Sequence, residues 1–132
     1  MGLILEMKYE HNHVEIRDGI RKLCSRFPGV YWQKCDRQHK YPSEFVSALT
    51  EKGYLSTLIP EKYGGLGLPI SAAAAILEEI HWSGGNAAAC HAQMYTMGTL
   101  LRHGSEEQKN QFLPKLASGK LRLQAFGVTE PN

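Results

Sequence analysis

The sequence has little net charge of either sign. Its 15 Lys and Arg residues against 13 Asp and Glu residues leave a formal net charge of +2, and the basic residues are scattered along the chain. This balance argues against a domain that binds nucleic acid or an acidic membrane surface through a basic patch. With 132 residues, 42% of them hydrophobic and 21% charged, the composition is typical of one soluble globular domain.

Cysteine is scarce and its positions form no framework. Cys24, Cys35 and Cys90 are odd in number, and their spacings fit no zinc or redox motif. A chain of this length needs no disulfides, so we expect a reducing compartment. The six histidines have no paired-ligand spacing, and we expect no metal site.

The sequence also lacks a hydrophobic run suited to a membrane. Residues 81–101 contain no Lys, Arg, Asp or Glu and are about as long as a membrane span. Several Gly, Ser, Asn, His and Gln side chains interrupt this stretch, which favours a helix inside a soluble bundle. The first nine residues lack the long apolar core and cleavage site of a signal peptide.

Apolar residues at helical spacing predict most of the fold. Helices are expected at 14–27, after Pro42, after Ser71 as its N-cap, at 86–103 and at 105–119, with a short helix or ordered loop at 31–40. Because the 86–103 segment is apolar or small nearly all round, it is predicted to be the central helix. Ser105 and Gln108 match a capping box, and Pro114 should kink or restart the last helix.

Two carboxylates and a glycine-rich run invite functional interpretations that the spacing disfavours. Glu78 and Glu79 are neighbours on a helix, where successive side chains diverge, so we expect both to point outward into solvent. The glycines at 64, 65 and 67 follow a proline and precede no Lys-Ser/Thr pair. They indicate a tight interhelical turn rather than a phosphate-binding loop.

The pattern changes near the C-terminal end. Leu121, Leu123 and Ala125 alternate with polar residues, which is a strand period. A single strand leaves its backbone groups unpaired, so the chain is expected to be part of something longer or to pair with another chain. The predicted fold class is all-α: an up-and-down helical domain of five or six helices with one terminal β-strand.

Several segments, in the right order and spacing, resemble the N-terminal half of an acyl-CoA dehydrogenase. They read I-P-E-K-Y-G-G-L-G-L at 59–68, L-E-E-I at 77–80, H-G-S-E-E-Q-K at 103–109, F-L-P-K-L-A-S-G at 112–119 and F-G-V-T-E-P at 126–131. The resemblance implies an N-terminal extension at 1–13, a helical domain at 14–119, and the first strand and turn of a β domain at 120–132. It also implies a cytoplasmic protein, or one of the mitochondrial matrix in a eukaryote.

The resemblance implies FAD as cofactor and oxidation of an acyl-CoA substrate to trans-2-enoyl-CoA. In the family, the strand and turn carrying T-E-P lie against the flavin, which assigns Phe126, Val128 and Thr129 to cofactor binding. The central helix lines the acyl pocket, which assigns the same-face residues Ala88, His91 and Tyr95 to substrate binding, although ordinary core packing explains each nearly as well. A homo-oligomer is also expected.

A patch around Leu66, Leu68 and Ile76 is similar to the family's docking surface for electron-transferring flavoprotein. The same leucines are equally consistent with turn residues folded onto the core. The family's catalytic glutamate lies in a C-terminal domain outside this sequence, so no catalytic residue is assigned, and the chain alone is expected to be inactive. Two alternatives remain: an acyl-CoA oxidase domain, and a stand-alone helical binding or assembly module without flavin.

Overall fold

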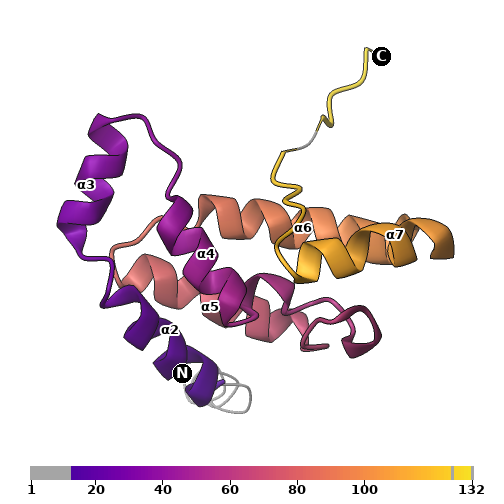
Figure 1. Cartoon of the computed structure of the whole chain (residues 1–132), viewed down its shortest axis with the longest axis horizontal. Coiled ribbons are helices and arrows are strands. Elements are labelled where there is room, and N and C mark those ends of the chain that lie inside the picture. Colours follow the sequence, from indigo (N-terminus) through magenta and orange to yellow (C-terminus); the bar gives the residue numbers. More distant parts are fainter. Residues whose placement is uncertain (1–12, 126, 132) are drawn as a thin grey trace, which may run out of the picture.

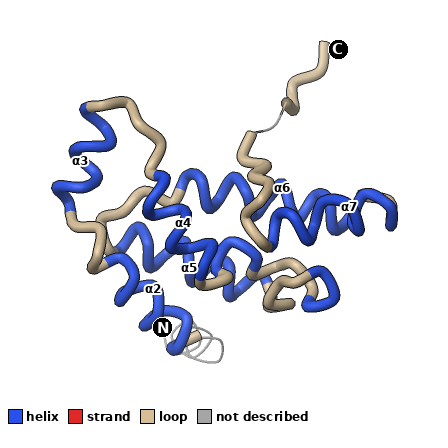
Figure 2. Tube along the Cα trace, in the orientation of Figure 1, coloured by secondary structure: helices blue, strands red, loops and turns tan. Residues whose placement is uncertain are grey.

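The computed structural model describes residues 13–125 and 127–131, and this part of the chain is helical without any strand (Figures 1 and 2). The prediction of an all-α domain is confirmed. None of the described helices has the length and apolar character needed to cross a membrane. The elements are α2 (Val14–Cys24), α3 (Gly29–Arg37), α4 (Ser43–Glu51), the 3-10 helices η1 (Tyr54–Ser56) and η2 (Glu61–Tyr63), α5 (Ile70–Trp82), α6 (Ala88–His103) and α7 (Glu106–Ala117).

Helices α2 and α5 pack side by side and run in the same direction (Figure 1). At one end, His13 Nε2 lies 2.9 Å from Ser71 Oγ. Further along, Arg21 Nε donates to Glu79 Oε2 at 2.8 Å. Helix α5 begins at Ile70, directly after Pro69, so Ser71 lies in its first turn and is not the predicted cap. Because α5, α6 and α7 follow one another through short connections, these three alternate in direction (Figure 1).

Helix α6 packs against α5, α7 and η1, as expected for the central helix. One face, carrying Cys90, Met94 and Met97, is buried in the core. The opposite face differs from the prediction of a helix enclosed on all sides, because Ala88 and His91 are exposed. Helices within the described residues cover one side of α6, which leaves its small-residue face open to a ligand or another domain.

The glycine-rich stretch forms the tight turn that the sequence predicted. Gly64 adopts φ 85°, a left-handed conformation that suits glycine. The amides of Leu66, Gly67 and Leu68 donate to the carbonyls of residues 56, 59 and 57 at 3.2, 2.8 and 2.8 Å. These amides are therefore occupied within the turn, and they form no cradle for a phosphate.

Helix α7 begins with the predicted capping box. The backbone N–H of Gln108 donates to Ser105 Oγ at 3.1 Å, and the backbone N–H of Ser105 donates to Gln108 Oε1 at 2.8 Å. The helix continues through Pro114 to Ala117, so the proline does not restart it. Gly119 then ends this region with φ 73°.

The strand predicted at 121–125 is not formed within the described residues, because a strand needs a partner and none lies beside this segment there. Leu121 and Leu123 instead pack against the helical core. Arg122 Nη1 donates to Thr50 Oγ1 at 3.1 Å. The segment is thus held against the helices, whereas residues 127–131 extend away from them (Figure 1).

Candidate functional site

A cleft of about 1090 Å³ lies on the open side of α6. Its walls are α3, the loop at 39–42, the loop at 84–86, the first half of α6 and the segment 122–125. Segments from both ends of the sequence therefore meet around it. Its volume lies slightly above the range of about 300–1,000 Å³ that is typical of small-molecule and cofactor sites.

Two of the three residues predicted to bind substrate line this cleft. Ala88 and Tyr95 belong to its wall on α6, with Ala92 between them. His91 is exposed and outside the lining, and its ring meets the Tyr95 ring edge-on at a centroid distance of 5.2 Å. Ala88 and Tyr95 therefore share a side of α6 at the cleft, whereas His91 does not belong to the lining.

The cleft combines apolar surface with polar groups of both signs. Alanines on α6 give the cleft apolar surface, and Asp36, Lys40 and Arg122 bring charged groups to its lining. This mixture is typical of sites that hold an apolar group and orient it by a few polar contacts. No group of three or more His, Cys, Asp or Glu side chains is placed to hold a metal ion in the part of the chain that the structure describes.

A chain of hydrogen bonds ties one wall of the cleft to the core. Tyr41 Oη donates to Gln124 Oε1 at 2.7 Å, and Gln124 Nε2 donates to Gln93 Oε1 at 3.2 Å. Gln93 Nε2 in turn donates to the backbone carbonyl of Leu55 at 3.2 Å. Gln93 is 1% exposed, so its amide is satisfied entirely inside the protein.

Two of the residues predicted to bind the cofactor lie on the extending segment. Val128 is 68% exposed, and Thr129 is also exposed. Phe126, the third of these residues, lies outside the described residues. The described part of the chain therefore leaves Val128 and Thr129 accessible to a further group.

The residues predicted to bind a partner separate into two environments. Leu66 is 39% exposed and Leu68 is half-buried, both in the turn after η2. Ile76 is fully buried among the core side chains, so it does not reach the surface where a partner docks.

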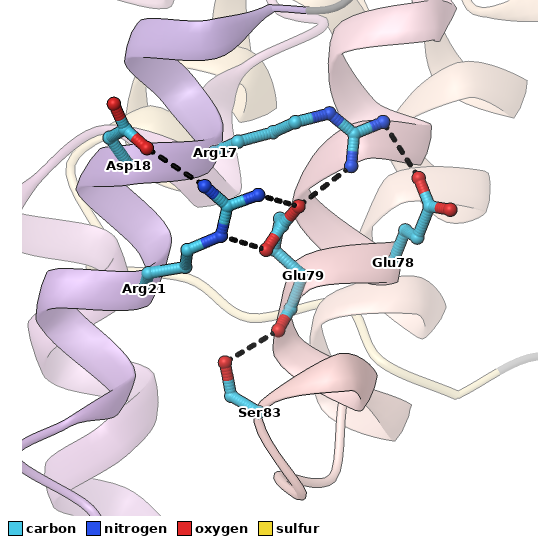
Figure 3. Close-up of polar contacts among 6 residues, drawn as sticks. All are labelled: Arg17, Asp18, Arg21, Glu78, Glu79 and Ser83. Atoms are coloured by element: carbon cyan, nitrogen blue, oxygen red, sulfur yellow. Dashed lines mark hydrogen bonds and ion pairs between the residues drawn. The ribbon is translucent and has the colours of Figure 1, made fainter. Parts of the chain in front are cut away.

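Glu79 corrects the prediction that both neighbouring carboxylates point into solvent. The residue is 4% exposed, whereas the Glu78 side chain is 64% exposed. Glu79 accepts hydrogen bonds from Arg17 and twice from Arg21, all at 2.8 Å (Figure 3). Burial opposes its ionisation, but the two guanidinium groups outweigh burial and lower its pKa. Glu79 is therefore a fixed structural anion, unlike a general base, whose pKa lies near the operating pH.

Several residues of the cleft were not predicted from the sequence. Trp32, Gln33 and Asp36 come from α3, a segment whose weak periodicity gave no sign of its role. Gln93 does not line the cleft but holds Gln124, and it did carry a signal, since it is a long polar side chain among apolar and small residues of the predicted central helix. Gln124 and Tyr41 carried none, because only the fold brings these two loops together.

Comparison with known families and relatives agrees with the sequence motifs at 59–68, 77–80, 103–109 and 112–119. The model for the N-terminal domain of acyl-CoA dehydrogenases matches residues 10–120. "Probable acyl-CoA dehydrogenase fadE25" of Mycobacterium leprae (strain TN) is 35% identical over 117 residues, covering 87% of this chain and 29% of that protein. Glutaryl-CoA dehydrogenase of Desulfococcus multivorans is 35% identical over 124 residues, covering 89% of this chain and 30% of that protein.

The chain thus spans less than a third of the length of these curated relatives. No solved structure matches it. The family match nevertheless covers nearly the whole helical domain, including the α6 face that lines the cleft. The chain therefore belongs to the acyl-CoA dehydrogenase family, and its helices form the N-terminal domain of that family.

Proposed function

We propose that this chain supplies the helical wall of the acyl pocket in a flavin-dependent acyl-CoA dehydrogenase. The observation that carries the proposal is the cleft of about 1090 Å³ lined by Ala88 and Tyr95 of α6. The full-length protein oxidises an acyl-CoA thioester to the trans-2-enoyl-CoA. The names of the two relatives, one of them a glutaryl-CoA dehydrogenase, support an acyl-CoA substrate.

The residues of α6 suit an acyl chain for simple physical reasons. Ala88, Ala89 and Ala92 have small side chains, so an acyl chain can approach the helix backbone closely. Tyr95 closes the wall further along, and its edge contact with His91 restricts its ring. The role of these residues is to bind and orient the substrate and to exclude water, while acid–base chemistry comes from outside this sequence.

Residues 127–131 suit contact with FAD. Val128 and Thr129 are exposed, and neither makes a hydrogen bond with another described residue. Thr129 therefore keeps a hydroxyl and an amide to donate, and Val128 offers apolar surface. The flavin, when bound, accepts hydride from the substrate. Leu66 and Leu68 form the surface for electron-transferring flavoprotein in this proposal, without Ile76.

The first test is the visible absorption of the purified chain after incubation with excess FAD and desalting. We expect no retained flavin and a helical circular dichroism spectrum, since this chain holds only part of the cofactor site. Retained flavin absorbance indicates instead that these residues, completed by an oligomer, hold the cofactor themselves.

The second test separates the activity of the full-length protein from that of the chain. The full-length protein is expected to convert acyl-CoA to enoyl-CoA and to pass electrons to electron-transferring flavoprotein, whereas the chain is expected to do neither. Turnover by the 132-residue chain contradicts the division of roles. A full-length protein that oxidises no acyl-CoA contradicts the function itself.

A further inference from the structure

In the hydrogen-bond chain from Tyr41 to Leu55, the donor and the acceptor at each link are fixed. The Leu55 carbonyl accepts and cannot donate, so Gln93 must present its amide nitrogen to it. The oxygen of Gln93 then faces Gln124, which must donate through its own nitrogen. The remaining oxygen of Gln124 accepts from the Tyr41 hydroxyl. A backbone carbonyl in the core therefore dictates the orientation of two side chains at the cleft.

Burial makes this chain hard to rearrange. Gln93 is 1% exposed and lies among the apolar side chains around α6. An amide at such a position is strongly disfavoured unless its donor and acceptor are both bonded. Loss of either neighbour leaves a buried polar group unpaired, so the position of Gln124 is coupled to the interior of the domain.

The outer end of the chain is part of the cleft itself. Gln124 and Tyr41 both line it, together with Ala88 and Tyr95 of α6. Arg122 fastens the same segment a second time, through its 3.1 Å hydrogen bond to Thr50 on α4. The distance between the 122–125 wall and the α6 wall is therefore set by side-chain hydrogen bonds, in a segment that has no strand partner within the described residues.

We propose that Gln93 and Gln124 are positioning residues that hold the 122–125 wall and Tyr41 at a fixed distance from α6, and thereby set which acyl groups the cleft accepts. The inference rests on the proposed function of the cleft. Neither glutamine is assigned to touch the reacting atoms. Their effect on substrate choice is exerted through the wall that they hold.

The test uses the full-length protein and its Gln124→Ala and Gln93→Leu variants. Gln111→Ala is the matched control, because Gln111 is exposed on α7 and does not line the cleft. The first measurement is the rate of tryptic cleavage after Arg122, with cleavage after Lys52 as an internal reference. Loss of one buried hydrogen bond is expected to accelerate cleavage after Arg122 by about two- to tenfold.

The second measurement is kcat and KM for butanoyl-CoA and dodecanoyl-CoA. A released wall is expected to change KM rather than kcat, and to shift the kcat/KM ratio toward the longer acyl group by about two- to tenfold. General destabilisation lowers both activities together and leaves this ratio unchanged. The Gln93→Leu/Gln124→Ala double variant is expected to match the stronger single variant, because both substitutions break one connection.

The outcomes separate the two proposals. If cleavage after Arg122 is unchanged in Gln124→Ala, the hydrogen bonds of Gln124 do not hold the 122–125 segment. An equal change in Gln111→Ala leads to the same conclusion. Faster cleavage with an unchanged acyl ratio overturns the positioning role and leaves the proposed function standing. A wild-type protein that oxidises no acyl-CoA thioester, glutaryl-CoA included, overturns the proposed function, and the positioning role with it, even if the cleavage result is positive. Gln124→Ala keeps the test decisive if Gln93→Leu fails to fold.

Discussion

Arg21 and Glu79 meet in a bidentate ion pair, with Nε to Oε2 and Nη2 to Oε1 both at 2.8 Å. Arg17 adds a third hydrogen bond to the same carboxylate at 2.8 Å (Figure 3). Planar guanidinium and carboxylate groups bind in this geometry with high directional specificity. The cluster therefore aligns α2 and α5, which lie far apart in the sequence.

Substitution Glu79→Gln is expected to destabilise the chain by about 2–3 kcal/mol, because a buried charge-assisted network loses its anion. The lowered pKa of Glu79 means that its contribution is fully present above its ordinary value of 4.5 and is lost as pH falls through the folded-state pKa. Urea unfolding between pH 3 and 7 measures both effects.

The exposed neighbour provides the control for this experiment. Glu78→Gln removes one hydrogen bond to Arg17 at a side chain that is 64% exposed, so its effect should be small. If Glu78→Gln and Glu79→Gln unfold at the same urea concentration at pH 7, the buried cluster does not carry the proposed stability.

Two glycines are expected to respond to alanine in opposite directions. A Cβ at Gly65 would lie 2.0 Å from the backbone oxygen of Ile59, so Gly65→Ala should destabilise by about 1–3 kcal/mol or more. A Cβ at Gly98 on α6 meets nothing within 4 Å, so Gly98→Ala should stabilise by about 0.5–1 kcal/mol. Thermal unfolding of both variants checks the sign, and a stable Gly65→Ala would refute the close approach.

The capping box of α7 predicts a specific, local loss. Ser105→Ala removes the side chain that accepts from the Gln108 backbone, and should destabilise by about 1 kcal/mol. Because the two halves of the box act together, the Gln108→Ala variant should add little once Ser105 is replaced. A double-mutant cycle by chemical unfolding measures this coupling. If the two losses of unfolding free energy add fully, the capping box does not act as a unit.

The three cysteines are expected to differ in reactivity. Cys24 and Cys90 are buried, and burial raises the pKa of Cys90 to about 12. Cys35 is partly exposed and lines the cleft. In the native chain at pH 8, a thiol reagent should label Cys35 first, as read by peptide mass spectrometry. The other two should react only after denaturation, and early labelling of Cys90 would contradict its placement.

The cleft predicts how a larger side chain on α6 alters substrate choice. Ala88→Leu fills part of the wall, so in the full-length protein it should raise KM for dodecanoyl-CoA more than for butanoyl-CoA, by about tenfold for two to three extra buried methylenes. Ala74→Leu, on the exposed face of α5, is the matched control. Equal KM values for Ala88→Leu and wild type would place the acyl group elsewhere.

Local patterns predicted most helices, because their signals lie within a few residues. The capping pair Ser105 and Gln108 and the turn glycine Gly64 needed no knowledge of the rest of the fold. Helix boundaries were less accurate: α5 begins at Ile70 rather than at Ser71, and α2 ends at Cys24. Near a proline or a small polar residue, a helix can begin at any of several positions, and packing selects one of them.

The sequence alone determined the all-α class and the motifs that lead to the family. Only the tertiary structure decided that Glu79 is buried while Glu78 is exposed, because that choice depends on two arginines about sixty positions away. The same holds for the cleft wall at Gln124, which Tyr41 and Gln93 hold from distant elements. Helical periodicity says which residues share a face, but the partner of that face is set by long-range packing, which no short window of sequence contains.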